Sequence, residues 1–363
     1  MSIALVIMIT GALVGASCAI VGTFLVLRRM SMMGDAISHS VLLGIVAVFF
    51  FTGSRSPILA VLGAGAVGLL TVSLVELIYR TGRVKEDAAI GLVFPALFSI
   101  GVILVSRFPS AVHIDVDHVL YGEITFVAFD RLTLFGVDAG YRSFWLLGAM
   151  TIVNALFVLL FFKELKLATF DRGFAAALGF APTVIHYALM ALVSATTVVA
   201  FDSVGAILVV AMLIVPAAAA YLLTDRLLVM LGLAVAIGSG SAIGGYWLAR
   251  WIDGSIAAAM AVVAGVVFVA CFLFAPRHGL VARYVQLFTV RRAFARSLLL
   301  SHLRLHPGGV SMETIGERFL WSRRMTSNVV TAAVQDGLVT DSPARRLTLT
   351  KLGSVQAQQV PGH

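Results

Sequence analysis

An aspartate and a histidine stand four residues apart in the stretch RRMSMMGDAISHSVLLG, which begins at Arg28. On an α-helix, the side chains of Asp35 and His39 project from one face. A carboxylate and an imidazole together suit zinc, manganese or iron(II) far better than potassium or an organic solute. The spacing also allows a second interpretation, in which Asp35 caps a helix and His39 hydrogen-bonds a carbonyl.

The sequence around this pair is too apolar for a water-soluble protein. Hydrophobic residues make up 60% of the 363 residues, charged residues only 12%, and the mean hydropathy is +1.02. Runs of about 18 or more nearly uncharged residues are long enough to cross a bilayer as helices. Such runs lie near 3–27, 34–52, 57–79, 88–106, 144–162, 182–200, 203–223, 227–249 and 254–275. We therefore expect an all-α polytopic membrane protein with eight or nine transmembrane helices.

The count depends on the pair 182–200 and 203–223, which only Phe201 and Asp202 separate. One of these helices could be broken or re-entrant. Transporters place ion contacts at broken helices, so Asp202 is a further candidate metal ligand, weaker than Asp35. Pro216, in LIVPAAAA, removes one backbone hydrogen bond from its helix and could act as a gate hinge or only shape the helix.

Other ionisable groups have both a structural and a functional interpretation. Glu76 and His186 lie inside apolar runs, where we expect helix packing or interfacial hydrogen bonding rather than contact with a transport path.

The excess of Lys and Arg in alternate connections predicts an N-terminus outside and an acidic 107–143 connection outside. There, Asp115 and Asp117 alternate on one side of an extended segment, where they could attract cations or simply form a solvated loop.

The C-terminal tail has a different composition. Residues 276–363 hold 12 Lys and Arg against 4 Asp and Glu, which accounts for the whole net charge of +8. Helices near 290–305, 311–319 and 323–336, followed by a β-hairpin, predict a small α+β winged-helix-like domain. The expected domains are thus 1–276 in the membrane, a 277–289 linker and 290–358 in the cytoplasm.

The sequence holds no GxxxxGK[ST] phosphate loop and no hydrolase motif, so we expect a non-enzymatic protein.

FLVLRRMSMMGDAISHSVLLGI resembles the signature of the metal-type ABC importer permeases, which take up manganese, zinc or iron. DVDHVLYGEITFVAFDRL resembles their outer loop, KELKLATFDRGFAAALGF their coupling segment, and VGAILVVAMLIVPAAAAYLLTDRL the helix that follows. The four motifs agree in order and spacing over residues 3–275.

The resemblance implies that Asp35 and His39 are ligands for a transported manganese, iron or zinc ion, with no permanently bound cofactor. Its outer loop favours manganese or iron. The implied partners are cytoplasmic ATPase subunits, an extracytoplasmic metal-binding protein, and a second copy or a similar permease. The implied location is the cell (inner or plasma) membrane, within the lipid bilayer, with the C-terminal domain in the cytoplasm.

The coupling segment also has a pattern of its own. Helical spacing places apolar side chains on one face, with Asp171 as N-cap and Gly179 as the stop. An interfacial helix has the same pattern, but the resemblance favours docking of the ATPase. The predicted docking residues are Phe170, Asp171, Phe174, Ala177, Leu178 and Gly179.

The alternative function is that of a membrane-anchored, metal-responsive regulator whose winged helix binds DNA or a protein. Basic residues of the tail would contact phosphates in that case. These residues are Arg318, Arg323, Arg324, Arg345, Arg346 and Lys351. Cytoplasmic tails of membrane proteins are commonly basic, so DNA binding is the weaker alternative.

Overall fold

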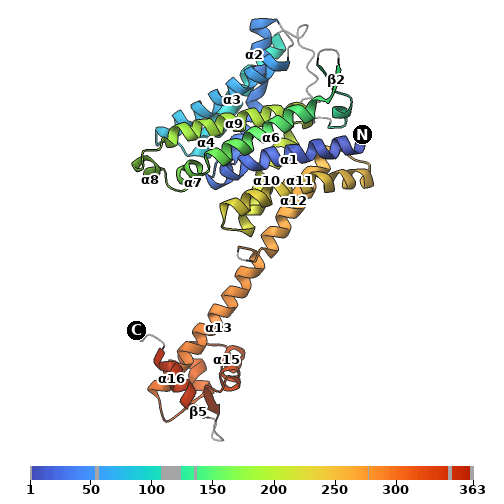
Figure 1. Cartoon of the computed structure of the whole chain (residues 1–363). Coiled ribbons are helices and arrows are strands. Elements are labelled where there is room, and N and C mark those ends of the chain that lie inside the picture. The colour runs from blue at the N-terminus through green and yellow to red at the C-terminus, as the bar shows by residue number, and fades with distance from the viewer. Residues whose placement is uncertain are drawn as a thin grey trace. The chain divides into compact units, whose positions relative to one another are not determined.

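The computed structural model describes residues 2–53, 57–107, 124–134, 137–276, 278–341 and 346–359. The chain divides into two compact units, Met1–Pro276 and Arg277–His363, called here the membrane unit and the C-terminal unit. The membrane unit contains the helices α1 (Ile3–Leu27), α2 (Met32–Thr52), α3 (Pro57–Arg80), α4 (Glu86–Arg107), α6 (Arg142–Leu160), α7 (Phe162–Phe170), α8 (Arg172–Ala177), α9 (Pro182–Val204), α10 (Ala206–Leu223), α11 (Leu227–Ile252) and α12 (Ile256–Phe274) (Figure 1).

Nine helices in the described part of the chain are long and apolar enough to cross a membrane, namely all those above except α7 and α8. The prediction of a helical, multi-spanning protein is confirmed. Both α9 and α10 have a full span's length, which favours nine crossings over eight. The interruption predicted at Phe201 and Asp202 is wrong, because α9 continues to Val204 and the chain turns at Gly205, where φ is 80°. Glycine adopts this left-handed backbone without a steric penalty.

The connection before α6 contains elements that the sequence did not predict. A single 3-10 turn, Phe126–Ala128, precedes strands β1 (Arg131–Leu134) and β2 (Val137–Tyr141). The two strands pair antiparallel as a hairpin, with an irregularity in register between Arg131 and Thr133. This hairpin leads directly into α6, so it fixes the start of that span.

Helix α1 packs against α6, α9, α10 and α11, and α2 packs against α3 and α4. Small residues allow the closest approaches. A Cβ atom on Gly15 of α1 would lie 2.6 Å from the carbonyl carbon of Gly238 in α11, so both positions require glycine at this crossing. Such contacts hold helices together in lipid, where apolar side chains gain little from leaving an equally apolar solvent.

Buried hydrogen bonds add specificity to this packing. The Asn154 side chain of α6 donates to the Ser17 carbonyl of α1 at 3.2 Å and to Thr196 Oγ1 of α9 at 2.8 Å. Thr71 of α3 donates to Ser40 Oγ of α2, also at 2.8 Å. Because lipid offers no competing partners, these bonds fix how the helices are rotated against each other.

The C-terminal unit has its own small core. Its elements are α13 (Leu280–Leu305), β3 (Val310–Ser311), α14 (Met312–Phe319), α15 (Arg323–Gln335), β4 (Val339–Asp341), β5 (Arg346–Leu349) and α16 (Lys351–Gln359). The strands form an antiparallel sheet in the order β3-β5-β4. Leu299, Ile315 and Val330 pack in a buried cluster with Leu347. The helix expected near 290–305 begins at Leu280, so much of the segment expected as a linker is helical.

Candidate functional site

The Asp35 and His39 side chains lie together on α2, as their spacing predicts. His39 Nε2 is 3.4 Å from Asp35 Oδ1, and each side chain is about one-third exposed, 34% for His39 and 31% for Asp35. Asp35 lies in the first turn of α2, whose N-cap is Ser31. The interpretation of Asp35 as the helix cap is therefore wrong, because its carboxylate pairs with the imidazole.

Two aromatic rings of α4 fix the imidazole. His39 stacks on Phe94 at 5.6 Å between ring centroids, and Phe98 meets it edge-on at 6.0 Å. The rings cover the apolar faces of the imidazole, while its Nε2 edge stays directed at the carboxylate. The pair thus offers a nitrogen and an oxygen donor in fixed geometry, and neither side chain is fully buried within the chain.

Asp202 lies at a different place in the membrane unit. It is in the last turn of α9, where Arg142 Nη2 lies 3.3 Å from its carboxylate, and Arg142 Nη1 lies 3.4 Å from that of Asp130. Arg142 thus ties the start of α6 to the end of α9. Among the described residues, no three His, Cys, Asp or Glu side chains are placed to hold one metal ion. Asp115 and Asp117 lie outside the described residues.

Pro216 lies buried inside α10, which is a single helix on both sides of it. In the preceding turn, Leu213 packs directly on Gly22 of α1 and on Gly34 of α2, the neighbour of Asp35. The proline-bearing helix is therefore in contact with the segment that carries the Asp35 carboxylate. A change in the bend of α10 would move that segment.

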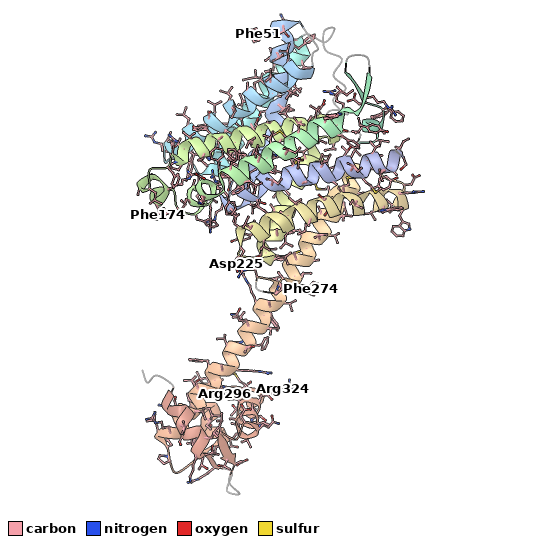
Figure 2. The ribbon with its side chains drawn as sticks, viewed as in Figure 1. Phe51, Phe174, Asp225, Phe274, Arg296 and Arg324 are labelled. Carbon is pink, nitrogen blue, oxygen red and sulfur yellow. The ribbon has the colours of Figure 1, made fainter. Side chains whose placement is uncertain are left out.

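The predicted docking segment consists of two short helices rather than one. Asp171 ends α7 and caps α8, its Oδ1 accepting a hydrogen bond from the Phe174 N–H at 2.8 Å, which confirms the N-cap prediction. The chain turns after α8 at Gly179, where φ is 85°. Phe170, Phe174 and Leu178 are each more than half exposed, and Figure 2 shows Phe174 at the end of the unit where α8 lies. The segment presents an apolar surface without a partner in the described chain.

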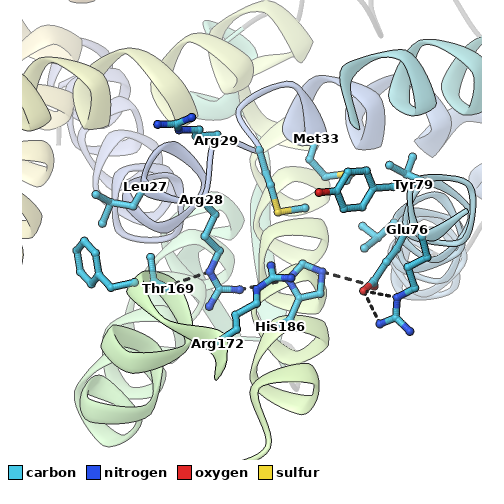
Figure 3. A pocket seen from close by; sticks show the side chains of 14 residues that line it. Leu27, Arg28, Arg29, Met33, Glu76, Tyr79, Thr169, Arg172 and His186 are labelled. Carbon is cyan, nitrogen blue, oxygen red and sulfur yellow. Dashed lines mark hydrogen bonds and ion pairs between the residues drawn. The ribbon is translucent and has the colours of Figure 1, made fainter. Parts of the chain in front are cut away.

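A pocket of about 420 Å³ lies between this segment and the ends of α1 and α3 (Figure 3). We call it the arginine pocket, because its charged lining consists of Arg28, Arg29, Glu76, Arg80, Arg172 and His186. Arg28 Nε donates to Thr169 Oγ1 of α7 at 3.1 Å, and Arg28 Nη1 lies 3.2 Å from His186 Nδ1. Figure 3 shows the imidazole between Arg28 and Glu76.

Glu76 completes this chain of contacts. Its carboxylate lies 3.6 Å from His186 Nε2 and accepts hydrogen bonds from Arg80 at 2.6 and 3.1 Å. Glu76 and His186 thus make polar contacts where helices pack, in line with the expectation of helix packing or interfacial hydrogen bonding, with Glu76 bonded to Arg80 of its own helix and His186 to Arg28. The sequence did not predict that Arg28 contacts Thr169 and His186, because in the sequence Arg28 only marks the end of a span. Burial, aided by the charge of Arg172, lowers the pKa of Arg28 to about 10.

Comparison with known proteins decides the family. The model of the ABC 3 transport family matches residues 2–275, which is the whole membrane unit apart from its ends. The chain belongs to the ABC 3 transport family. Together with the nine span-length helices in the described chain, this makes it a multi-pass membrane protein of that family.

Relatives within the ABC 3 transport family are similar over most of the chain. The manganese transport system membrane protein MntD of Bacillus subtilis is 51% identical over 286 residues, covering 79% of this chain and 97% of the relative. The zinc transport system membrane protein TroD of Treponema pallidum is 45% identical over 358 residues, with 97% of each protein covered. The match to TroD therefore extends into the C-terminal unit.

A solved structure supports the fold. PsaBC from Streptococcus pneumoniae in complex with Fab is similar with a TM-score of 0.64 and 31% sequence identity, over 79% of this chain and 95% of that one. The covered share of this chain is close to the length of the membrane unit. The helix arrangement described above is thus that of an ABC 3 family member.

Proposed function

We propose that this chain is the membrane-spanning subunit of an ATP-driven importer for a divalent transition metal ion, namely manganese, iron or zinc. Family membership and relatives named for manganese, zinc and chelated iron transport support the proposal. The observation that carries it is the half-buried pair of Asp35 and His39, because a carboxylate beside an imidazole in a membrane span suits such ions and little else.

In this proposal Asp35 and His39 take the ion from water in one step of alternating access. The two donors leave coordination positions for water, for a second copy of this chain or for a similar permease, with which it would form the path. Asp202 is the weaker candidate, because its carboxylate already pairs with Arg142. Asp115 and Asp117 would attract the ion from an extracytoplasmic binding protein. Pro216 would serve as a gate hinge, since α10 contacts Gly34 beside the pair.

ATP hydrolysis would take place on separate cytoplasmic subunits. The exposed apolar side chains of Phe170, Phe174 and Leu178 would dock into that partner, with Asp171, Ala177 and Gly179 shaping the segment. Arg28 connects this surface through Thr169 to the end of α1, and only three residues separate Arg28 from the start of α2. A movement of the docking segment would therefore shift the end of α1 and, through it, the start of α2, which carries Asp35.

For the C-terminal unit we infer a winged-helix-like domain on the cytoplasmic side. Its order of helix, strand, two helices and two strands, with the sheet order β3-β5-β4, supports this fold. Basic residues at the start of α15, Arg323 and Arg324, would face a partner that regulates transport. A shift of duplex DNA by the full-length chain at low salt would support the alternative role as a DNA-binding regulator.

The test is metal uptake into proteoliposomes that contain the full chain, the ATPase and the binding protein. We expect ATP-dependent uptake of manganese, iron or zinc, reduced about a hundredfold by Asp35→Asn or His39→Gln, because the first removes the negative charge of the carboxylate and the second removes the imidazole nitrogen. Asp87→Asn at the exposed start of α4 and His302→Gln in the C-terminal unit are matched controls.

Two negative outcomes have different meanings. If the unmodified protein imports none of these metals, the proposed function is wrong. If it imports metal and both substitutions leave uptake unchanged at equal protein levels, the function stands and the assignment of Asp35 and His39 is wrong.

A further inference from the structure

The arginine pocket has more positive charge than its own residues compensate. Glu76 pairs with Arg80 and lies beside His186, so its negative charge is already used. Within the described parts of the chain, no carboxylate forms an ion pair with Arg28, Arg29 or Arg172. Arg28, Arg29 and Arg172 therefore line one cavity without a carboxylate partner, and the transport function proposed above uses only the contact of Arg28 with Thr169.

Arg28 carries the strongest sign of a missing partner. Its Nε and Nη1 have partners in Thr169 and His186, but its Nη2 is buried and has no hydrogen-bond partner among the described residues. A buried donor without an acceptor is costly, and more so when it is charged. The lowered pKa of Arg28, caused by burial and then by Arg172, indicates the same shortage of negative charge.

The location of the pocket indicates where an anion would come from. Leu27, which ends the first span, and Arg80, which ends the third, both line it. The ends of spans lie at the level of lipid headgroups. Met33, Val72 and Val75 supply an apolar wall beside the arginines. Basic pockets of this kind between membrane helices suit anionic lipid headgroups, and guanidinium groups match phosphate oxygens as paired donors.

We propose that the arginine pocket binds the phosphate of an anionic phospholipid headgroup, held by Arg28, Arg29 and Arg172. The buried Arg28 Nη2 donates to a phosphate oxygen at the bottom of the pocket, and the two exposed arginines close over the headgroup. The bound lipid would then connect α1 with α8, so that lipid composition affects how firmly the docking segment is held.

The experiment measures lipid binding to the full-length chain in neutral detergent, without ATPase, by native mass spectrometry and thermal shift. The probes are dioctanoyl phosphatidylglycerol, dioctanoyl phosphatidylcholine and inorganic phosphate. We expect saturable binding of phosphatidylglycerol, about tenfold tighter than phosphatidylcholine and weakened by salt, because the headgroup charge supplies the affinity. Inorganic phosphate should not compete at similar concentrations, since it lacks the apolar part that meets Met33 and Val75.

The variant Arg29→Gln/Arg172→Gln leaves Arg28 and its contacts in place, which protects the fold. We expect it to weaken phosphatidylglycerol binding about tenfold or more, whereas Arg29→Lys/Arg172→Lys retains most of the affinity. Arg226→Gln removes an exposed arginine outside the pocket and is the matched control, with affinity unchanged.

Three results would overturn the proposal. Equal affinity for phosphatidylglycerol and phosphatidylcholine would show that the headgroup charge does not determine binding. Competition by inorganic phosphate at matching concentrations would identify a soluble phosphate as the ligand. Wild-type lipid binding by the Arg29→Gln/Arg172→Gln variant would show that these arginines do not hold the headgroup.

Discussion

Replacement of Asp171 by alanine should weaken coupling to the ATPase by a predictable amount. Asp171 caps α8 through a 2.8 Å hydrogen bond from the Phe174 N–H. Helix α8 has only six residues, and Ala175 is its one buried residue. A helix this short is unstable alone, so its formation depends on the cap and on few packing contacts.

Loss of an N-cap costs about 1 kcal/mol, which corresponds to roughly a fivefold change in the ratio of formed to unformed helix. If the formed helix presents Phe174 and Leu178 to the ATPase, the concentration of ATPase that gives half-maximal metal uptake should rise by up to about fivefold, the full factor applying when the formed helix is the minor state before binding. Maximal uptake at saturating ATPase should change little, because binding recovers the formed state.

The assay is a titration of ATPase against proteoliposomes that hold a fixed amount of the permease. Asp171→Asn and Asp171→Ser are matched controls, since asparagine and serine also cap helices and should keep the titration within about twofold of wild type. An unchanged titration for Asp171→Ala would refute the capping argument. Equal weakening by Asp171→Asn would show that the negative charge, rather than the cap, is required.

Three further predictions follow from particular contacts. Gly15→Ala places a methyl group 2.6 Å from the Gly238 carbonyl carbon and should lower the free energy of unfolding by about 1–3 kcal/mol. Gly232→Ala is the control, because the space around Gly232 is open and its free energy of unfolding should not fall. Equal thermal stability of the two variants would contradict this prediction. Metal affinity should fall as pH drops, because His39 must be neutral to coordinate, and a flat pH profile of metal binding would argue against ligation. Burial, followed by the charges of His306 and Arg318, lowers the pKa of His302, so the folded C-terminal unit binds fewer protons than the unfolded one and loses stability as pH falls below about 6.5. Hydrogen exchange in α13 of the full chain, at about pH 7.5 and about pH 5.5, should show this loss, and His302→Gln should reduce it.

Features that depend on neighbouring residues in the chain could be predicted from sequence. The spans follow from runs of apolar residues, because a run of about 20 apolar residues is by itself sufficient for a helix to cross the bilayer. The meeting of Asp35 and His39 follows from the 3.6-residue period of a helix, and the cap at Asp171 from the orphan N–H groups at a helix start.

Features that join distant segments required the tertiary structure. Pairing of Asp202 with Arg142 and stacking of His39 on Phe94 depend on how helices are rotated against each other, which buried contacts such as that of Asn154 decide. The arginine pocket combines residues from α1, α3, α8 and α9. In the sequence, its arginines look like the ordinary basic residues found near the ends of membrane helices. Charge patterns along a chain place arginines at one side of the membrane, but only packing brings Arg28, Arg172 and His186 around one cavity and leaves a buried donor without an acceptor.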